Sequence, residues 1–287
     1  MIVSFHPLFE ADKNIICAGR NPDSGDLAAI KAADAVILNQ GCYKSLYYMA
    51  RDNCANVFPN YDARFKYPGK IGQTKLFQKK AVAHPKTVIF HNADSFINHY
   101  GRYSERLSLD FPFVFKFDWG GEGENVYLIK SVEDLQDVLQ KAAIYENTGQ
   151  TGFLIQEYIP SQNRSLRVVV INQKIITYWR VLKNKEGFCA NLSQGAVIDF
   201  DSDPDLQEIA AFSVKNFCKH TAINLAGIDI LFSSDTEPQE RAHSPQLQIK
   251  QLFFLEINYF FGRQGLGGSE KYYKLLVAEI RGWIESL

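Results

Sequence analysis

Hydrophobic positions in the first eighty residues fall into short runs with one amphipathic segment between them. The runs Asn14–Ala18 and Ala35–Leu38 are short and apolar, which predicts buried strands. Lys44–Asp52 places aromatic residues on one face of a helix. This part of the chain is therefore predicted to form a small α/β unit.

The next eighty residues predict a hairpin with glycines at its tip. A helix is expected at Gln73–Ala83, ending before Pro85, and a strand at Thr87–Phe90. Strands at Phe113–Phe117 and Val126–Ile129 flank a glycine-rich segment, so that strand, loop and strand follow one another. This order differs from the strand-to-helix turn of a Rossmann or Walker phosphate site.

The remainder of the chain is dominated by strands and closes with a helix. The polar segment Ser233–Gln248 contains two prolines and is expected to be an exposed loop between two apolar strands. The predicted elements are, in order, a helix at Glu133–Ala143; strands at Phe153–Tyr158, Arg167–Ile171 and Lys174–Val181; a helix at Asp205–His220; strands at Ala226–Phe232 and Leu252–Ile257; and a helix at Ser269–Leu287.

The composition is that of a globular protein without a strong charge bias. Hydrophobic residues make up 46% and charged residues 22% of the 287 residues. Lys plus Arg (31) nearly cancels Asp plus Glu (32), so the chain lacks the basic excess expected of a protein that binds nucleic acid or an anionic membrane. Neither a nucleic acid nor a membrane is therefore expected as a partner, and any anion site must be local.

The N-terminus and the cysteines favour a cytoplasmic protein. Met1–Glu10 lacks a basic segment, and His6 and Pro7 interrupt its apolar run, so a signal peptide is not expected. No apolar stretch of the sequence is long enough to span a bilayer. The five cysteines are odd in number and scattered, without a C-x-x-C spacing, which argues against a disulfide framework or a zinc ribbon.

The glycine-rich segment is the first candidate for chemistry. Gly120, Gly121 and Gly123 would let backbone N–H groups approach phosphate oxygens, and Lys116 on the preceding strand would supply a positive charge for the same group. The alternative is a β-hairpin with a flexible tip and no ligand.

A strand end supplies the second candidate. Gln156, Glu157, Tyr158 and Ile159 precede Pro160, and backbone groups exposed at such a strand end could read the edge of an adenine ring. In this interpretation the exocyclic amine of the base donates to Glu157. The segment could equally be a strand end without a ligand.

Two arginines in strands form the third candidate. Arg167, flanked by Leu166 and Val168, and Arg180 lie in neighbouring predicted strands, and Asn191 follows them. A guanidinium inside a packed strand costs several kcal/mol unless it is paired, which indicates a ligand or a partner. Exposure of either arginine on the surface is the simpler explanation.

Acidic residues in two apolar strands form the fourth candidate. Asp229 lies in Gly227–Ile230, whereas Glu256 and Asn258 lie two residues apart and so share one face of their strand. Carboxylate and amide oxygens are what a hard cation such as Mg²⁺ takes. The alternative is a structural ion pair between these acids and Arg167 or Arg180.

Taken in order, these segments resemble the ATP-grasp superfamily, and most closely its RimK-like ATP-dependent ligases, which add amino acids to carboxyl groups. The match runs from about Gly72 to Gly268. The resemblance implies an α+β fold in which the nucleotide is bound between two α+β lobes. It divides the chain into an N-terminal α/β domain (1–80), a central lobe with the glycine-rich hairpin (81–160) and a C-terminal lobe with the metal site (161–287).

The resemblance also assigns roles to particular residues. It implies phosphate contacts for Lys75, Lys116, Gly120, Gly121, Gly123 and Asn191; adenine contacts for Gln156, Glu157, Tyr158 and Ile159; a nucleotide contact for Ser165; contacts with the transferred phosphate and the acyl group for Arg167 and Arg180; and Mg²⁺ binding, or Mn²⁺ in its place, for Asp229, Glu256 and Asn258.

The activity implied by the resemblance is ligation of a carboxylate to an amine with ATP and Mg²⁺. The phosphate of ATP activates the carboxylate as an acyl phosphate, and an amine then attacks the acyl carbon. The acceptor would be a small molecule, an amino acid, a peptide or a protein, and the enzyme a cytoplasmic protein that could form a homo-oligomer.

Departures from the family pattern keep other functions open. Ser165 stands where relatives usually have Asp, Cys189 stands where they often have Arg, and a glycine-rich segment with Arg263 follows Asn258. Arg263 either contacts the carboxylate of an acceptor or belongs to a loop that serves only packing. The alternatives to a ligase are a kinase that phosphorylates a hydroxyl, an ATP-binding switch without turnover, and an unrelated α+β protein.

Overall fold

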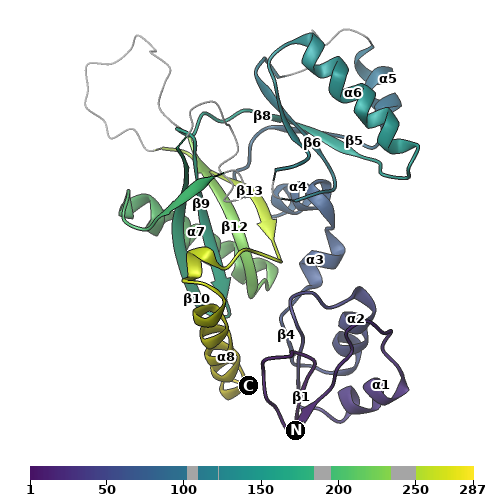
Figure 1. Ribbon diagram of the computed structural model, residues 1–287, viewed down its shortest axis with the longest axis vertical. Coiled ribbons are helices and arrows are strands. Elements are labelled where there is room, and N and C mark those ends of the chain that lie inside the picture. The colour runs from purple at the N-terminus through teal and green to yellow at the C-terminus, as the bar shows by residue number, and fades with distance from the viewer. Residues whose placement is uncertain (102–108, 122, 184–194, 234–249) are drawn as a thin grey trace.

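Three β-sheets organise the part of the chain that the structure describes (Figure 1). The structure is a computed structural model, and it describes residues 1–101, 109–121, 123–183, 195–233 and 250–287. Each sheet falls within one of the predicted segments 1–80, 81–160 and 161–287, whereas the domain boundaries themselves stay a prediction.

The first sheet is parallel and small, with the strand order β2-β1-β3-β4. Its elements are β1 (Ile2–Ser4), β2 (Lys13–Asn14), α1 (Ser24–Lys31), β3 (Ala35–Ile37), α2 (Lys44–Asn53) and β4 (Val57–Phe58). The strand predicted at Asn14–Ala18 is wrong beyond its first residue, because β2 ends at Asn14 and Ile16 is exposed. The chain turns away there, where Arg20 Nε donates to the carbonyl of Ile16 at 3.2 Å.

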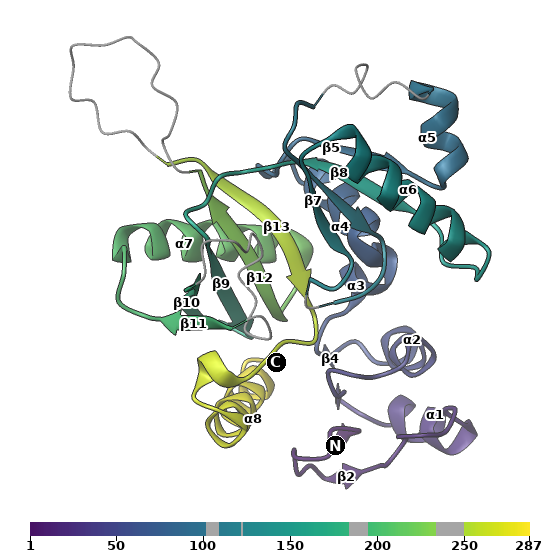
Figure 2. The same cartoon turned by 45° about the horizontal axis from the view of Figure 1, so that its top comes forward.

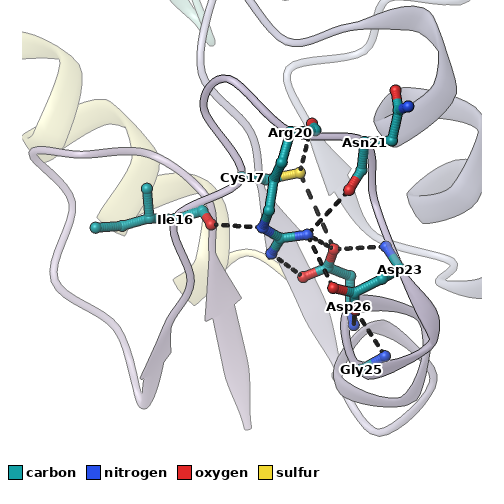
Figure 3. A network of polar contacts seen from close by, with 7 residues as sticks. All are labelled: Ile16, Cys17, Arg20, Asn21, Asp23, Gly25 and Asp26. Carbon is teal, nitrogen blue, oxygen red and sulfur yellow. Dashed lines mark hydrogen bonds and ion pairs between the residues drawn. The ribbon is translucent and has the colours of Figure 1, made fainter.

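A polar network holds the segment after β2 against α1, as Figure 3 shows. Arg20 donates two hydrogen bonds to the carboxylate of Asp26, at 2.6 and 2.7 Å. Asp23 caps the helix by accepting from the N–H groups of Gly25 and Asp26, at 2.9 and 3.0 Å. The hydrogen bonds from Arg20 hold the pKa of Asp26 below its usual value, since they favour the charged carboxylate.

Two helices connect the first sheet to the second, α3 (Asp62–Lys66) and α4 (Gly69–Lys79). α4 begins and ends earlier than the helix predicted at Gln73–Ala83. It starts after Pro68, and its free N–H at Ile71 donates to Asp118 Oδ1 at 2.7 Å, so a residue of the glycine hairpin acts as the cap. The helix ends before Ala81, whose φ of 52° is incompatible with a helix.

The second sheet is antiparallel, with the strand order β5-β8-β6-β7. Its elements are β5 (Thr87–Phe90), α5 (Ala93–Tyr100), β6 (Phe113–Phe117), β7 (Val126–Ile129), α6 (Val132–Glu146) and β8 (Phe153–Glu157). Strands β6 and β7 pair as the predicted hairpin around the glycines. Helices α5 and α6 lie over one side of this sheet (Figure 2), and an aromatic core that includes Phe90, Phe96, Phe115 and Phe153 lies between them.

The third sheet is also antiparallel, with the order β11-β10-β9-β12-β13. Its strands are β9 (Arg164–Ile171), β10 (Lys174–Leu182), β11 (Ala196–Asp199), β12 (Leu225–Phe232) and β13 (Leu252–Asn258). Side chains alternate between the two faces along β9: Val168 and Val170 belong to the core with α7 (Pro204–Thr221), whereas Val169 and Ile171 belong to the core with α8 (Ser269–Glu285).

The same α8 core reaches the first sheet, since Ile37 and Phe58 pack with Leu276 and Ile280. The N-terminal sheet and the third sheet are therefore held together through apolar contacts. Within the described ranges, no helix has both the length and the apolar character that crossing a membrane requires.

Candidate functional site

A cleft that is open to solvent is lined by residues of the second sheet, of the third sheet and of α4, and it holds about 1020 Å³ of empty space, part of which is open solvent. The cleft gathers predicted residues from segments far apart in sequence, namely Lys116, Gly121, Gly123, Gln156, Glu157, Tyr158, Ile159, Ser165, Arg180, Asp229 and Glu256.

The glycine hairpin forms one rim of the cleft. Gly120 and Gly123 have φ angles of +85° and +81°, a conformation that residues other than glycine rarely adopt. Gly120 itself lies outside the lining, where a Cβ would meet Asn125 Nδ2 at 2.4 Å. The hairpin is tied to α4 because Lys70 Nζ donates to the carbonyls of Trp119 and Gly120, at 3.2 and 2.9 Å.

Lys116 is buried in β6 and oriented by a short chain of hydrogen bonds. Its Nζ donates to Gln156 Oε1 at 2.6 Å, and Gln156 Nε2 donates to Thr87 Oγ1 at 2.9 Å. Gln156, which the sequence assigned to adenine, thus also fixes the ammonium group that the sequence assigned to phosphate.

The strand end after Gln156 faces an apolar part of the cleft. Val114, Val126, Leu154, Leu231 and Leu255 supply its walls, which suits a planar aromatic ring. The Glu157 side chain is already engaged, because its Oε2 accepts from the Lys86 N–H at 3.2 Å. A carboxylate can accept more than one hydrogen bond, so the contact of Glu157 with adenine stays a prediction beside the backbone groups of this strand end.

Both predicted arginines are buried, which excludes the alternative that they lie on the surface. Arg167 is 7% and Arg180 is 6% exposed. Both pair with Asp229: Arg167 Nε lies 2.5 Å and Arg180 Nη2 2.8 Å from Asp229 Oδ1. Gly227 leaves room for this arrangement, since a Cβ there would meet Arg167 Nη1 at 2.9 Å.

The two positive charges decide the ionisation of Asp229. Burial alone would raise the pKa of Asp229, but Arg167 and Arg180 outweigh it and hold that pKa below its usual value. Arg180 also donates to Ser165 Oγ at 2.9 Å. Its Nε is nevertheless one of the buried side-chain atoms that lack a partner in the described part of the chain, so the guanidinium has capacity left for an anion.

The strand register places two of the three metal candidates, Asp229 and Glu256, in one row with Arg167. Arg167, Asp229 and Glu256 lie opposite one another on β9, β12 and β13, and a bulge between Asp229 and Ile230 brings Leu255 and Glu256 both to the cleft. Asn258 Nδ2 donates to Asp229 Oδ2 at 3.1 Å. The structural ion pair that competed with the metal interpretation is therefore present at Asp229.

The oxygen atoms of Glu256 and Asn258 nevertheless suit a hard cation on the side of Asp229 where these two residues lie. The side chain of Glu256 makes no hydrogen bond or ion pair with the described residues, and the side chain of Asn258 uses only its amide nitrogen. A carboxylate and an amide oxygen therefore remain available beside Asp229. No cluster of three or more His, Cys, Asp or Glu side chains suited to a metal occurs in the described ranges. The ligands on offer are the carboxylate of Glu256 and the amide oxygen of Asn258, beside the Asp229 carboxylate, which already accepts from Arg167, Arg180 and Asn258.

Besides Gly120, three predicted site residues within the described ranges lie outside the lining of the cleft, namely Lys75, Arg167 and Asn258. Lys75 is exposed on α4 and outside the cleft, whereas Lys70, on the same helix, lines it. Arg167 and Asn258 lie behind the lining, next to Asp229. Asn191 lies outside the described residues, as does Cys189.

Sequence reasoning missed six polar residues of the cleft lining, namely Lys70, Gln73, Thr74, Asn125, Ser161 and Arg164. Arg164 pairs with Asp203 and lies 4.2 Å from the ring of Trp179. A helix start at the Pro68–Gly69 step would have put Lys70 at the head of α4, because proline favours the first positions of a helix.

A second cavity, of about 970 Å³, opens at the carboxyl ends of β1 and β3. It is lined in part by His6, whose pKa is lowered to about 4 by burial and by the nearby charge of Arg263. Arg263 itself lies over the ring of Tyr273 at 4.5 Å and lines neither cavity. The loop after β13 adjoins this region, where Gln40 Nε2 donates to the Tyr259 carbonyl at 3.4 Å.

The sequence matches a known family over the part that carries the cleft. The model of the RimK-like ATP-grasp domain matches residues 69–259, about two thirds of the chain. The chain belongs to the RimK-like ATP-grasp family, as the order of its motifs predicted. The matched range begins at the first residue of α4.

A relative of known activity covers part of this range. The coenzyme gamma-F420-2:alpha-L-glutamate ligase of Methanocaldococcus jannaschii is 28% identical over 166 residues, which are 56% of this chain and 52% of that protein. The chain thus matches about half the length of this relative.

Solved structures share the ATP-grasp fold. A RimK domain ATP-grasp protein from Sphaerobacter thermophilus has a TM-score of 0.57 at 11% identity, with 97% of this chain and 98% of that chain covered. The N5-carboxyaminoimidazole synthetase of Staphylococcus aureus, complexed with ADP, has a TM-score of 0.57 at 12% identity, with 90% and 63% covered. The predicted α+β ATP-grasp fold is confirmed.

Proposed function

We propose that the protein is an ATP-dependent carboxylate–amine ligase that acts through an acyl phosphate and releases ADP. The observation that carries the proposal is the row of Arg167, Asp229 and Glu256 on the third sheet, which faces Lys116 and the glycine hairpin across one cleft. Such a cleft concentrates positive groups and oxygen ligands where the phosphates of a nucleotide would lie. The relative from M. jannaschii is itself named as a glutamate ligase.

Each wall of the cleft has a part in this proposal. Asp229, Glu256 and Asn258 would hold a divalent cation, which would neutralise phosphate charge when bound, and ATP would supply the phosphate that activates the carboxylate. Arg180, with its unpaired Nε, binds the developing charge of the acyl phosphate, while Arg167 keeps Asp229 ionised and in place.

The remaining groups bind and orient the nucleotide. Lys116, held by Gln156, and Gly121 and Gly123 contact phosphate, and the backbone after Gln156 reads adenine, with Ser165 near the sugar. Lys116 is one of two lysines expected to contact phosphate. We assign the other to Lys70 in place of Lys75, because Lys70 lines the cleft and Lys75 does not. No protein nucleophile is needed, since the chemistry depends on positioning and charge.

The substrates are proposed from the second cavity and from the relatives. The cavity at the carboxyl ends of β1 and β3 is where an open α/β sheet binds its ligand, and we place a carboxylate or amine substrate there. Small molecules, amino acids and peptides are the expected acceptors. Magnesium rather than manganese, a cytoplasmic location and a homo-oligomer stay predictions.

A kinase that phosphorylates a hydroxyl would use the same nucleotide residues, and a switch would bind ATP without turnover. The ligase is favoured because the M. jannaschii relative is named as a glutamate ligase. A screen decides between them. The protein is incubated with Mg-ATP and pooled amino acids, short peptides and carboxylic acids, and the masses of the products are measured by mass spectrometry.

The expected result of this screen is release of ADP together with a product whose mass equals that of acid plus amine minus water. A product that instead carries a phosphate group would identify a kinase. Tight ATP binding without any ADP release across the pools would favour the switch.

A further inference from the structure

The free edge of the third sheet is covered by a side chain rather than by a strand. β13 is the last strand of that sheet, so alternate N–H and C=O groups along it have no neighbouring strand to pair with. Gln73 of α4 fills one of these places: its Nε2 donates to the Ile257 carbonyl at 2.9 Å, and its Oε1 accepts from the Ile257 N–H at 2.8 Å.

This pair of hydrogen bonds is what a residue of an adjacent strand would make. Ile257 is the residue between Glu256 and Asn258, so fixing both of its backbone groups also fixes the directions of the two side chains beside it. A second contact anchors the same edge, because the N–H of Phe254 donates to the carbonyl of Ala83 at 2.8 Å.

The same helix also holds the glycine hairpin. Asp118 accepts from the N–H of Ile71 at the start of α4, and Lys70 donates to the hairpin carbonyls. Gln73 follows within the next turn of this helix and lines the cleft. α4 therefore joins the phosphate rim and the proposed metal strand through one rigid element.

We propose that Gln73 is a positioning residue: by pairing with the backbone of Ile257 it holds Glu256 and Asn258 in the orientation in which their oxygens bind the divalent cation. The proposal rests on the proposed function, because it needs the cation at these residues. Groups that orient metal ligands without touching the metal commonly change its affinity by about 10–100-fold when they are replaced.

The test measures metal binding instead of turnover. Mn²⁺ is titrated into the ADP-bound protein and its free concentration is followed by electron paramagnetic resonance. Gln73→Met keeps the length of the side chain and removes both hydrogen bonds, so it is expected to weaken Mn²⁺ binding about tenfold. Gln73→Asn keeps the amide but is one methylene too short to reach Ile257, so it should weaken Mn²⁺ binding to a similar extent. It serves as the test if Gln73→Met does not fold.

Two comparisons make the result specific. Gln78→Met, at an exposed position of the same helix, should bind both Mn²⁺ and ADP as the unaltered protein does. Glu256→Gln should lose Mn²⁺ binding. If Glu256→Gln loses it while Gln73→Met and Gln73→Asn bind normally, the role of Gln73 is refuted and the metal site stands. Normal binding by Glu256→Gln would overturn the metal assignment, and the role of Gln73 with it.

Discussion

Replacing Asp229 by Asn is expected to lower the free energy of unfolding by about 3–5 kcal/mol, the cost of removing one partner from a buried ion pair. The substitution keeps the shape of the side chain but leaves the guanidinium groups of Arg167 and Arg180 without a counter-charge. Both guanidinium groups are buried, so water solvates them far less than it would at the surface. Urea unfolding at neutral pH measures the difference.

An exposed ion pair provides the control for this experiment. Glu270 and Lys274 lie 2.8 Å apart with side chains that are 81% and 76% exposed, and Glu270→Gln should change stability by less than about 1 kcal/mol. If Asp229→Asn changed the free energy of unfolding as little as Glu270→Gln does, the result would contradict a buried cluster in which Asp229, Arg167 and Arg180 depend on one another.

The same cluster fixes the sign of a pH effect. The pKa of Asp229 is below its value in the unfolded chain, which is about 3.9. Its contribution to stability is therefore complete above that pH and is lost as the pH falls through the lower, folded-state pKa. The Asp229→Asn variant should lack this part of the acid dependence.

Replacing Glu256 by Gln is expected to lower metal-dependent turnover by at least about 100-fold, since even residues behind the metal ligands change activity by up to that factor. The fold should survive, because Glu256 is only half-buried and makes no hydrogen bond with the described residues. Turnover is measured as ADP release over a range of Mg²⁺ concentrations, once the screen has supplied a substrate pair.

Glu208→Gln on the exposed side of α7 is the matched control for this substitution and should retain turnover. A thermal unfolding midpoint close to that of the unaltered protein would show that Glu256→Gln is folded. Full activity in Glu256→Gln would remove Glu256 from the metal site.

The long apolar strands and the hairpin were predictable from sequence because their periodicity is strong. Phe113–Phe117, Val126–Ile129 and Thr87–Phe90 agree with the strands of the structure at both ends. In the first sheet and its helices, β3 and α2 agree within one residue with the predicted strand Ala35–Leu38 and the predicted helix Lys44–Asp52. The elements β4 and α1 were not predicted, since β4 has two residues and α1 lacks a pronounced apolar face. Tertiary contacts decide such elements, and α1 depends on the bonds between Arg20 and Asp26.

The candidate site was predictable where residue type is informative and not where it depends on geometry. A charged residue in an apolar strand pointed to Lys116, Arg167 and Asp229, and all three are buried at the interface of the two sheets. Gln73 carries no such signal, because a glutamine on a helix is common and its pairing with Ile257 appears only when the sheet edge is in place. Sequence alone also left open whether Asp229 pairs with arginine or with metal, and the structure adds the arginine pairs.

Trapping with hydroxylamine tests the central claim, activation of a carboxylate, most directly. Hydroxylamine replaces the amine in a reaction with Mg-ATP and the acid that the screen identifies. An acyl phosphate would be converted to a hydroxamate, and the account predicts one hydroxamate for each ADP released. Release of ADP with a phosphorylated hydroxyl and no hydroxamate would contradict it.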